Sequence, residues 1–102
     1  MTKDSQITVT VKEILDLIKN ISPGKSVELR VPPYGAIQCV AGSNHRRGTP
    51  PNTVEMSGQT LIRLINAPAL WSTLCESGEV RASGLLSDLS NLFAQAAVKY
   101  RA

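Results

Sequence analysis

The sequence predicts an α/β domain of the α+β kind: a twisted sheet of four to five strands, antiparallel or mixed, with helices packed on one face. Three observations lead to this prediction. Segments with helical and with strand periodicity both occur, the strands cluster early while helices close the chain, and 102 residues suit a single domain over residues 1–102. Elements in this order pack as two layers around one core.

A helix is predicted from Thr10 to Ile21, after a polar lead over residues 1–8. Thr10 and Glu13 have the spacing of a capping box, which satisfies free N–H groups at a helix start. Ser22-Pro23-Gly24 ends the helix, because proline cannot continue the hydrogen-bond ladder and glycine accepts a positive φ. The buried face repeats at helical spacing and comprises Val11, Ile14, Leu15 and Ile18.

Three strands are predicted next. Val27–Val31 alternates apolar and charged side chains, which is typical of a strand with one buried and one solvated face. Pro32–Gly35 turns the chain, and Ala36–Ala41 follows as a more buried strand. We expect these two strands to form a hairpin rather than one bent strand. A loop over residues 42–52 leads to a third, short strand, Thr53–Met56.

The middle of the chain predicts two short helices and a fourth strand. Ser57 is a good N-cap for a helix over Gln59–Ile65, and Pro68 suits the first turn of the next helix. Gly78 suits the C-terminal stop of that helix. Glu79–Ser83 is then predicted as the last strand.

The strongest helical periodicity lies in the final segment, about Leu86–Tyr100. Ser87 and Asp88 suit its N-terminus, where the helix dipole favours negative charge, and Lys99 suits its C-terminus. One face of this helix is predicted to gather the apolar side chains Leu85, Leu89, Leu92, Phe93, Ala96, Ala97 and Tyr100.

Composition and charge narrow the function only partly. Aromatic residues make up 4% of the chain, so the core is aliphatic, which suits an acyl chain and equally an ordinary packed core. The formal net charge is +3, and the basic residues are scattered apart from His45-Arg46-Arg47. This charge permits attraction to anionic lipid or nucleic acid but requires neither.

Cys39 and Cys75 are the two cysteines, and no CxxC motif is present. The chain opens without a secretory segment, and no apolar run approaches the ~20 residues that a membrane span needs. We therefore expect a cytoplasmic protein with two free thiols, although a disulfide between them stays open. One histidine and two distant cysteines give no metal-ligand spacing, and no cofactor is predicted.

Five segments together carry a familiar pattern: Val27–Tyr34, His45–Asn52, Trp71 with Leu74, Gly78–Gly84, and Asp88–Ser90. They resemble the bacterial orthologues of sterol carrier protein, small actinobacterial-type members of the sterol-carrier-protein-2-like group. The resemblance covers about residues 9–93, and the Arg-Gly-Thr-Pro-Pro-Asn loop is its most specific part.

The resemblance implies a twisted five-stranded sheet, with fatty acyl chains, acyl-CoA or sterols held in an apolar tunnel between the sheet and the helices. The alternative is that the same side chains fill an ordinary core. The residues that we expect to line such a cavity come from the third strand and the later helices: Val54, Met56, Leu61, Leu64, Ile65, Trp71, Leu74, Leu89, Leu92 and Phe93.

The loop residues His45, Arg46 and Arg47 are the candidate anion or head-group site. Arginine donates paired hydrogen bonds to phosphate or carboxylate, and backbone N–H groups beside Gly48 can add to them. The alternative is a solvated loop whose arginines pair with nearby carboxylates. No catalytic residue is predicted, because nothing indicates a base positioned beside a nucleophile.

Three functions follow from these observations. The first is non-catalytic binding or transfer of a hydrophobic small molecule, a lipid or acyl-CoA. The second is a ligand-free interaction domain that docks a partner enzyme, and a homodimer through the last turns of the final helix also stays open. The third, ranked below the other two, is nucleic-acid binding through Arg46 and Arg47.

Overall fold

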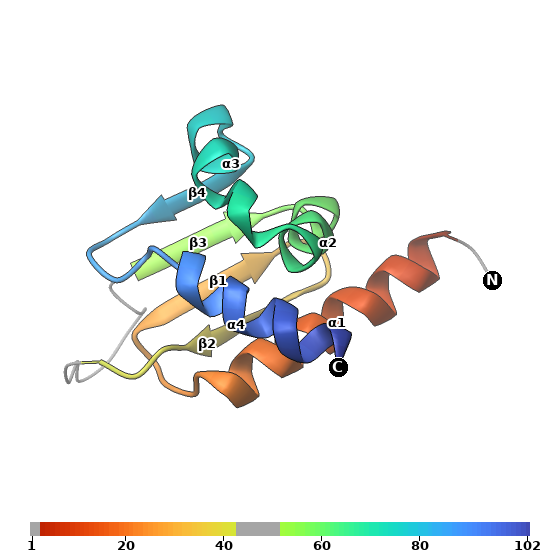
Figure 1. The fold of residues 1–102 in the computed structure, drawn as a ribbon, viewed down its shortest axis with the longest axis horizontal. Coiled ribbons are helices and arrows are strands. Elements are labelled where there is room, and N and C mark those ends of the chain that lie inside the picture. Colours follow the sequence, from red (N-terminus) through yellow and green to blue (C-terminus); the bar gives the residue numbers. More distant parts are fainter. Residues whose placement is uncertain (1–2, 43–51) are drawn as a thin grey trace.

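The computed structural model describes residues 3–42 and 52–102 (Figure 1). Helices and strands occur in the order that the sequence predicts, with a short 3₁₀ turn, η1, before the third helix. The elements are α1 (Lys3–Ile21), β1 (Val27–Val31), β2 (Gly35–Cys39), β3 (Asn52–Met56), α2 (Gly58–Asn66), η1 (Pro68–Leu70), α3 (Trp71–Ser77), β4 (Val80–Ser83) and α4 (Ser90–Arg101).

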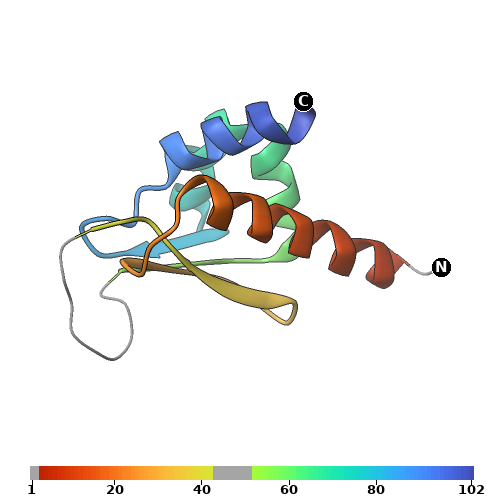
Figure 2. The ribbon, with the colours of Figure 1, turned by 90° about the horizontal axis from the view of Figure 1, so that it is seen from below.

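The four strands form one mixed sheet in the order β2-β1-β3-β4. β1 is antiparallel to β2 and parallel to β3, and β3 is antiparallel to β4. The antiparallel pairing of β1 with β2 confirms the predicted hairpin. Figure 2 shows α1 and α4 above the same face of the sheet. The predicted fold class, a mixed sheet with helices on one face, is confirmed.

Each central strand has one buried and one solvated face. In β1, Val27, Leu29 and Val31 are buried, whereas Glu28 and Arg30 between them are partly exposed. β3 repeats this pattern, with Asn52, Val54 and Met56 buried. The period of two that predicted these strands therefore also sorts their side chains between the helices and solvent.

The core is one cluster of buried apolar side chains from the sheet and all four α-helices. Within it the rings of Trp71 and Phe93 lie 5.8 Å apart, centroid to centroid. The helices α1, α2 and α4 contact one another over the sheet. Burying an aliphatic or aromatic side chain in such a core stabilises the fold by about 1.5–3 kcal/mol each.

The start of the first helix was predicted wrongly. α1 begins at Lys3, so Thr10 lies inside the helix and does not cap it. The β-branched residues near Thr10 are poor helix formers. However, Ile7 lies one turn before Val11 on the same face, and it packs against the core beside Tyr34. This tertiary packing extends the helix past the predicted cap.

The start of the last helix was also predicted wrongly. α4 begins at Ser90, and the segment before it is a turn in which Leu85 is fully exposed. Gly84 has φ +108, and the hydroxyl and backbone N–H of Ser87 both donate to the Gly84 carbonyl. These bonds close a turn over residues 84–87, so the predicted first residues of the helix, Leu86 and Ser87, are not helical.

Other local predictions are confirmed. The Ser57 hydroxyl accepts a hydrogen bond from the Thr60 N–H at 3.1 Å and so caps α2. Gly78 ends α3 in the left-handed conformation at φ +86. On α4, Leu92, Phe93, Ala96 and Ala97 face the core as predicted. Tyr100 was predicted on the same face, and this was wrong, because it is 37% exposed in the last turn. The predicted loop overlaps residues 43–51, which lie outside the described residues.

Candidate functional site

The ten residues predicted to line a cavity all lie in the core cluster, with 0–9% of each side chain exposed. They come from β3, α2, α3, α4 and the turn before α4. Leu89 and Leu92 also line a surface hollow at one end of the helical layer. The other eight do not line this hollow. They are packed against one another.

The hollow beside Leu89 and Leu92 has a volume of about 330 Å³. It lies where α1 ends and α4 begins, and Figure 2 shows these two helix ends at the same end of the molecule. We call it the helix-end hollow; it is lined by Ile21, Ser22, Val40, Leu85, Leu86, Asp88, Leu89, Asn91, Leu92 and Gln95. Six of these ten side chains are apolar, and two of the six belong to the core.

Two leucines at this hollow are exposed to water. Leu85 is 100% exposed and Leu86 is 41% exposed. A single exposed leucine is unremarkable, but these two adjoin a concave surface with both apolar and polar lining. The same hollow is also lined by the core residues Leu89 and Leu92, so exposed and buried apolar side chains meet there.

The turn that carries the two leucines is fixed by Asn52, a buried residue at the start of β3. The Asn52 side-chain amide donates to the Ser26 carbonyl at 2.8 Å, and its oxygen accepts from the Leu86 N–H at 2.9 Å. Gly84 lies so close that an added Cβ would be 2.2 Å from the Asn52 amide oxygen. Asn52 thus positions Leu86. Sequence reasoning assigned Asn52 to the loop motif and missed this role.

Val40 forms the other wall of the hollow in an unusual conformation. Its φ of +68 lies in the left-handed region, which a β-branched residue rarely adopts. Its N–H donates to the Ser22 carbonyl at 2.8 Å, and its carbonyl accepts from the Ser26 N–H at 3.1 Å. A Cβ on Gly24 would lie 2.1 Å from the Val40 oxygen, so the two segments touch through backbone. Strain of this kind persists only where the surroundings over-determine the conformation.

Among the ten lining residues of the helix-end hollow, Asp88 is the one with a charged side chain. A hydrogen bond from the Ser90 side chain, and then one from the Ser90 N–H at 2.9 Å, hold the pKa of Asp88 below its usual range. The carboxylate therefore caps the first turn of α4. Ser22, Asn91 and Gln95 add neutral hydrogen-bonding groups.

Comparison with known protein families shows the family to which this chain belongs. The family described as "Bacterial SCP ortholog" matches residues 3–94. The chain belongs to this family. A solved structure titled "UbiJ-SCP2 Ubiquinone synthesis protein" is similar over 100% of this chain and 98% of its own chain, with a TM-score of 0.56. At 18% identity that likeness shows the fold alone. No curated protein matches the sequence.

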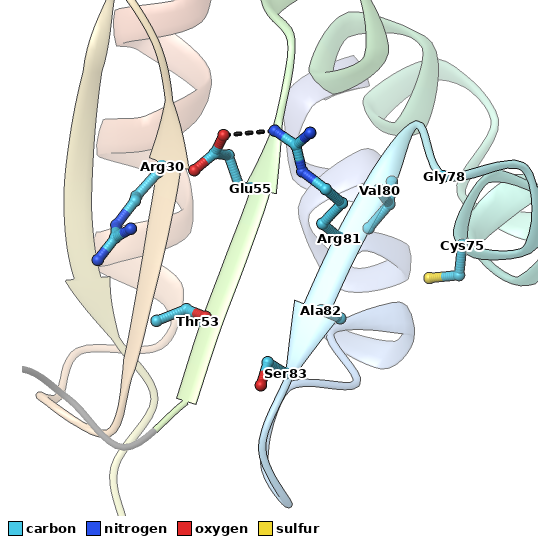
Figure 3. A pocket seen from close by; sticks show the side chains of 9 residues that line it. All are labelled: Arg30, Thr53, Glu55, Cys75, Gly78, Val80, Arg81, Ala82 and Ser83. Carbon is cyan, nitrogen blue, oxygen red and sulfur yellow. Dashed lines mark hydrogen bonds and ion pairs between the residues drawn. The ribbon is translucent and has the colours of Figure 1, made fainter.

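The molecule has a second, larger hollow of about 440 Å³, which lies over the helix-free face at β1, β3 and β4 and reaches past the β4 edge to α3 (Figure 3). It is lined by Arg30, Thr53, Glu55, Cys75, Gly78, Val80, Arg81, Ala82 and Ser83. We call it the open-face hollow. Glu55 lies between Arg30 and Arg81 in one row across the strands. Arg81 is paired with Glu55, and the Arg30 Nε donates to Glu28 at 2.7 Å. The charged side chains of this face are thus already paired with one another.

The two cysteines of this family member are free, as predicted. Burial raises the pKa of Cys39 to about 11, and burial together with the Asp88 charge raises that of Cys75. Among the described residues, no three His, Cys, Asp or Glu side chains gather as a metal ion requires. Within the same ranges, no helix has the length and apolarity to cross a bilayer. His45, Arg46 and Arg47 lie outside the described residues.

Proposed function

We propose that this chain binds a hydrophobic small molecule without catalysing a reaction on it, and that the helix-end hollow is where the ligand enters. The observation that carries this proposal is the exposed Leu85–Leu86 pair beside a hollow that core residues also line. Membership of the bacterial SCP orthologue family supports a lipid-binding role. A cytoplasmic location stays our prediction from the sequence.

The size of the hollow suits a small ligand. At about 330 Å³ it is near the lower end of the range for ligand sites, about 300–1,000 Å³. An alkyl chain laid along Leu85 and Leu86 removes exposed apolar surface from water, which yields about 25 cal/mol for each Å². The core residues Leu89 and Leu92 form the floor, so a longer chain reaches the predicted cavity only if these side chains move.

The test is displacement of a neutral fluorescent probe, 1-N-phenylnaphthylamine, by ten-carbon amphiphiles. We expect the probe to bind with a blue-shifted emission. Leu85→Asp should weaken binding at least about tenfold, because it places a charge against the alkyl chain. Leu85 is fully exposed, so this substitution leaves the folded core intact.

Val98→Asp is the matched control. Val98 is 71% exposed on α4 and is not among the residues that line the hollow. This variant makes the same chemical change on a surface apolar residue and should leave probe binding unchanged. The proposal is contradicted if wild-type protein does not bind the probe, or if the two variants weaken binding equally.

The second candidate is an interaction domain without a ligand, which docks a partner enzyme or a second copy of the chain. It is favoured by the burial of all ten predicted cavity residues in one packed cluster. The exposed Val98 and Tyr100 on α4 would supply the contact. Sedimentation velocity of wild type and Val98→Asp shows whether each protein is a monomer or self-associates. Self-association of the wild type that is lost in Val98→Asp would favour this candidate.

The loop residues His45, Arg46 and Arg47 stay proposed as an anion or head-group site. An acyl-CoA or a fatty acid would need such a site, since both carry negative charge at neutral pH. Their contribution is separated from that of the helix-end hollow by comparing charged and neutral ligands of equal chain length.

A further inference from the structure

The charges of the side chains around the helix-end hollow bear on which ligands it binds. Among residues 3–42 and 52–102, no lysine or arginine lines it, and its one charged side chain there is the carboxylate of Asp88. Lys19 is in the last turn of α1 and Lys25 follows that helix, but neither lines the hollow. A carboxylate or phosphate entering here meets a like charge.

The two helix ends at the hollow reinforce this signature. α1 ends at Ile21, so the hollow faces the carbonyl end of α1, the negative end of its dipole. α4 begins on the opposite side, and its N-terminus would attract an anion. That position is already occupied, because Asp88 accepts the Ser90 N–H at 2.9 Å. One N–H of this helix end is thus already bonded to a carboxylate, whose charge opposes a second anion.

The remaining polar lining consists of neutral groups, the Ser22 hydroxyl and the amides of Asn91 and Gln95. These groups accept as well as donate hydrogen bonds. Together with the Asp88 carboxylate they match a polar end that donates a hydrogen bond and carries no negative charge. The apolar wall at Leu85, Leu86 and Leu89 matches the alkyl part of the same molecule.

We propose that the helix-end hollow selects amphiphiles with a neutral, hydrogen-bond-donating head, such as a long-chain alcohol, over the fatty acid of equal chain length. This inference rests on the proposed function and specifies its ligand class. The helix-end hollow would therefore disfavour fatty acid anions and acyl-CoA. The basic loop at His45–Arg47 would instead favour these two ligands.

The experiment compares decanol with decanoate as competitors for 1-N-phenylnaphthylamine at pH 8, where decanoic acid is ionised. We expect decanol to bind about fivefold more tightly than decanoate, from repulsion by the solvent-exposed carboxylate of Asp88 at close range. Asp88→Asn should reduce this ratio to about twofold. Asparagine keeps an acceptor for the Ser90 N–H, so α4 remains capped.

Asp16→Asn is the control for net charge. Asp16 is an exposed carboxylate on α1 that does not line the hollow, and its removal should leave the ratio of affinities unchanged. Equal affinities, tighter binding of decanoate, or a ratio that Asp88→Asn leaves unaltered would overturn the inference. If both competitors bind and Leu85→Asp weakens both, the proposed function stands without this selectivity. If neither competitor displaces the probe, the proposed function itself is wrong.

Discussion

The helix-end hollow and the open-face hollow differ in how their polar groups are already used. On the open face, Arg81 is paired with Glu55 and Arg30 with Glu28. A ligand there must compete with these pairs. At the helix end, Asp88 caps α4, and Leu85 and Leu86 are exposed to solvent. The larger hollow is therefore the less available one, which shows that volume alone does not identify a binding site.

Two substitutions, one in the helical layer and one on the open face of the sheet, sharpen this comparison most. Phe93→Ala removes a fully buried ring next to Trp71 and should lower the free energy of unfolding by about 3–5 kcal/mol. Thr53→Ala on the open face should lower it by less than about 1 kcal/mol. Urea unfolding followed by Trp71 fluorescence measures both. Similar losses for the two variants would mean that the sheet has no distinct core face.

Asn52 connects the core side of β3 to the helix-end hollow. Asn52→Ala should lower the free energy of unfolding by about 1–3 kcal/mol, because the buried Ser26 carbonyl and Leu86 N–H lose their partner. It should also weaken probe binding, since the Leu86 turn is no longer held. Urea unfolding and probe titration on the same preparation check both effects. Unchanged probe affinity would show that Asn52 serves the fold alone.

The smallest effect is expected on the open face. Arg81→Ala removes the exposed pair with Glu55 and should change the free energy of unfolding by about 0–1 kcal/mol. Probe affinity at the helix-end hollow should stay the same. Urea unfolding and probe titration test these two expectations. A loss of probe binding in Arg81→Ala would show that the probe binds at the open-face hollow and not at the helix-end hollow.

The fold was predictable where a residue's neighbours in sequence decide its state. Three local signals are confirmed: the alternation over Val27–Val31, the cap at Ser57 and the left-handed end of α3 at Gly78. The two helix starts were missed because distant residues decide them. α1 extends through the packing of Ile7, and Asn52 holds Leu86 in a turn instead of a helix.

The candidate site was less predictable than the fold. Periodicity identified Leu89 and Leu92 as apolar, but it could not show that they border a surface hollow. Val40 and Asp88 enter the hollow only because α1, β2 and α4 end or begin at the same place. The spacing of residues along the chain does not predict that the ends of these three elements lie together. The placement of Leu85 on the face of a helix concealed its exposure altogether.

The most direct test of the account is a map of backbone and methyl chemical shifts during titration with decanol. The account predicts the largest changes at Val40, Leu86 and Leu89, around the helix-end hollow. It predicts unchanged signals for Thr53 and Arg81 on the open face. Changes confined to the open face, or no saturable change anywhere, would contradict the account.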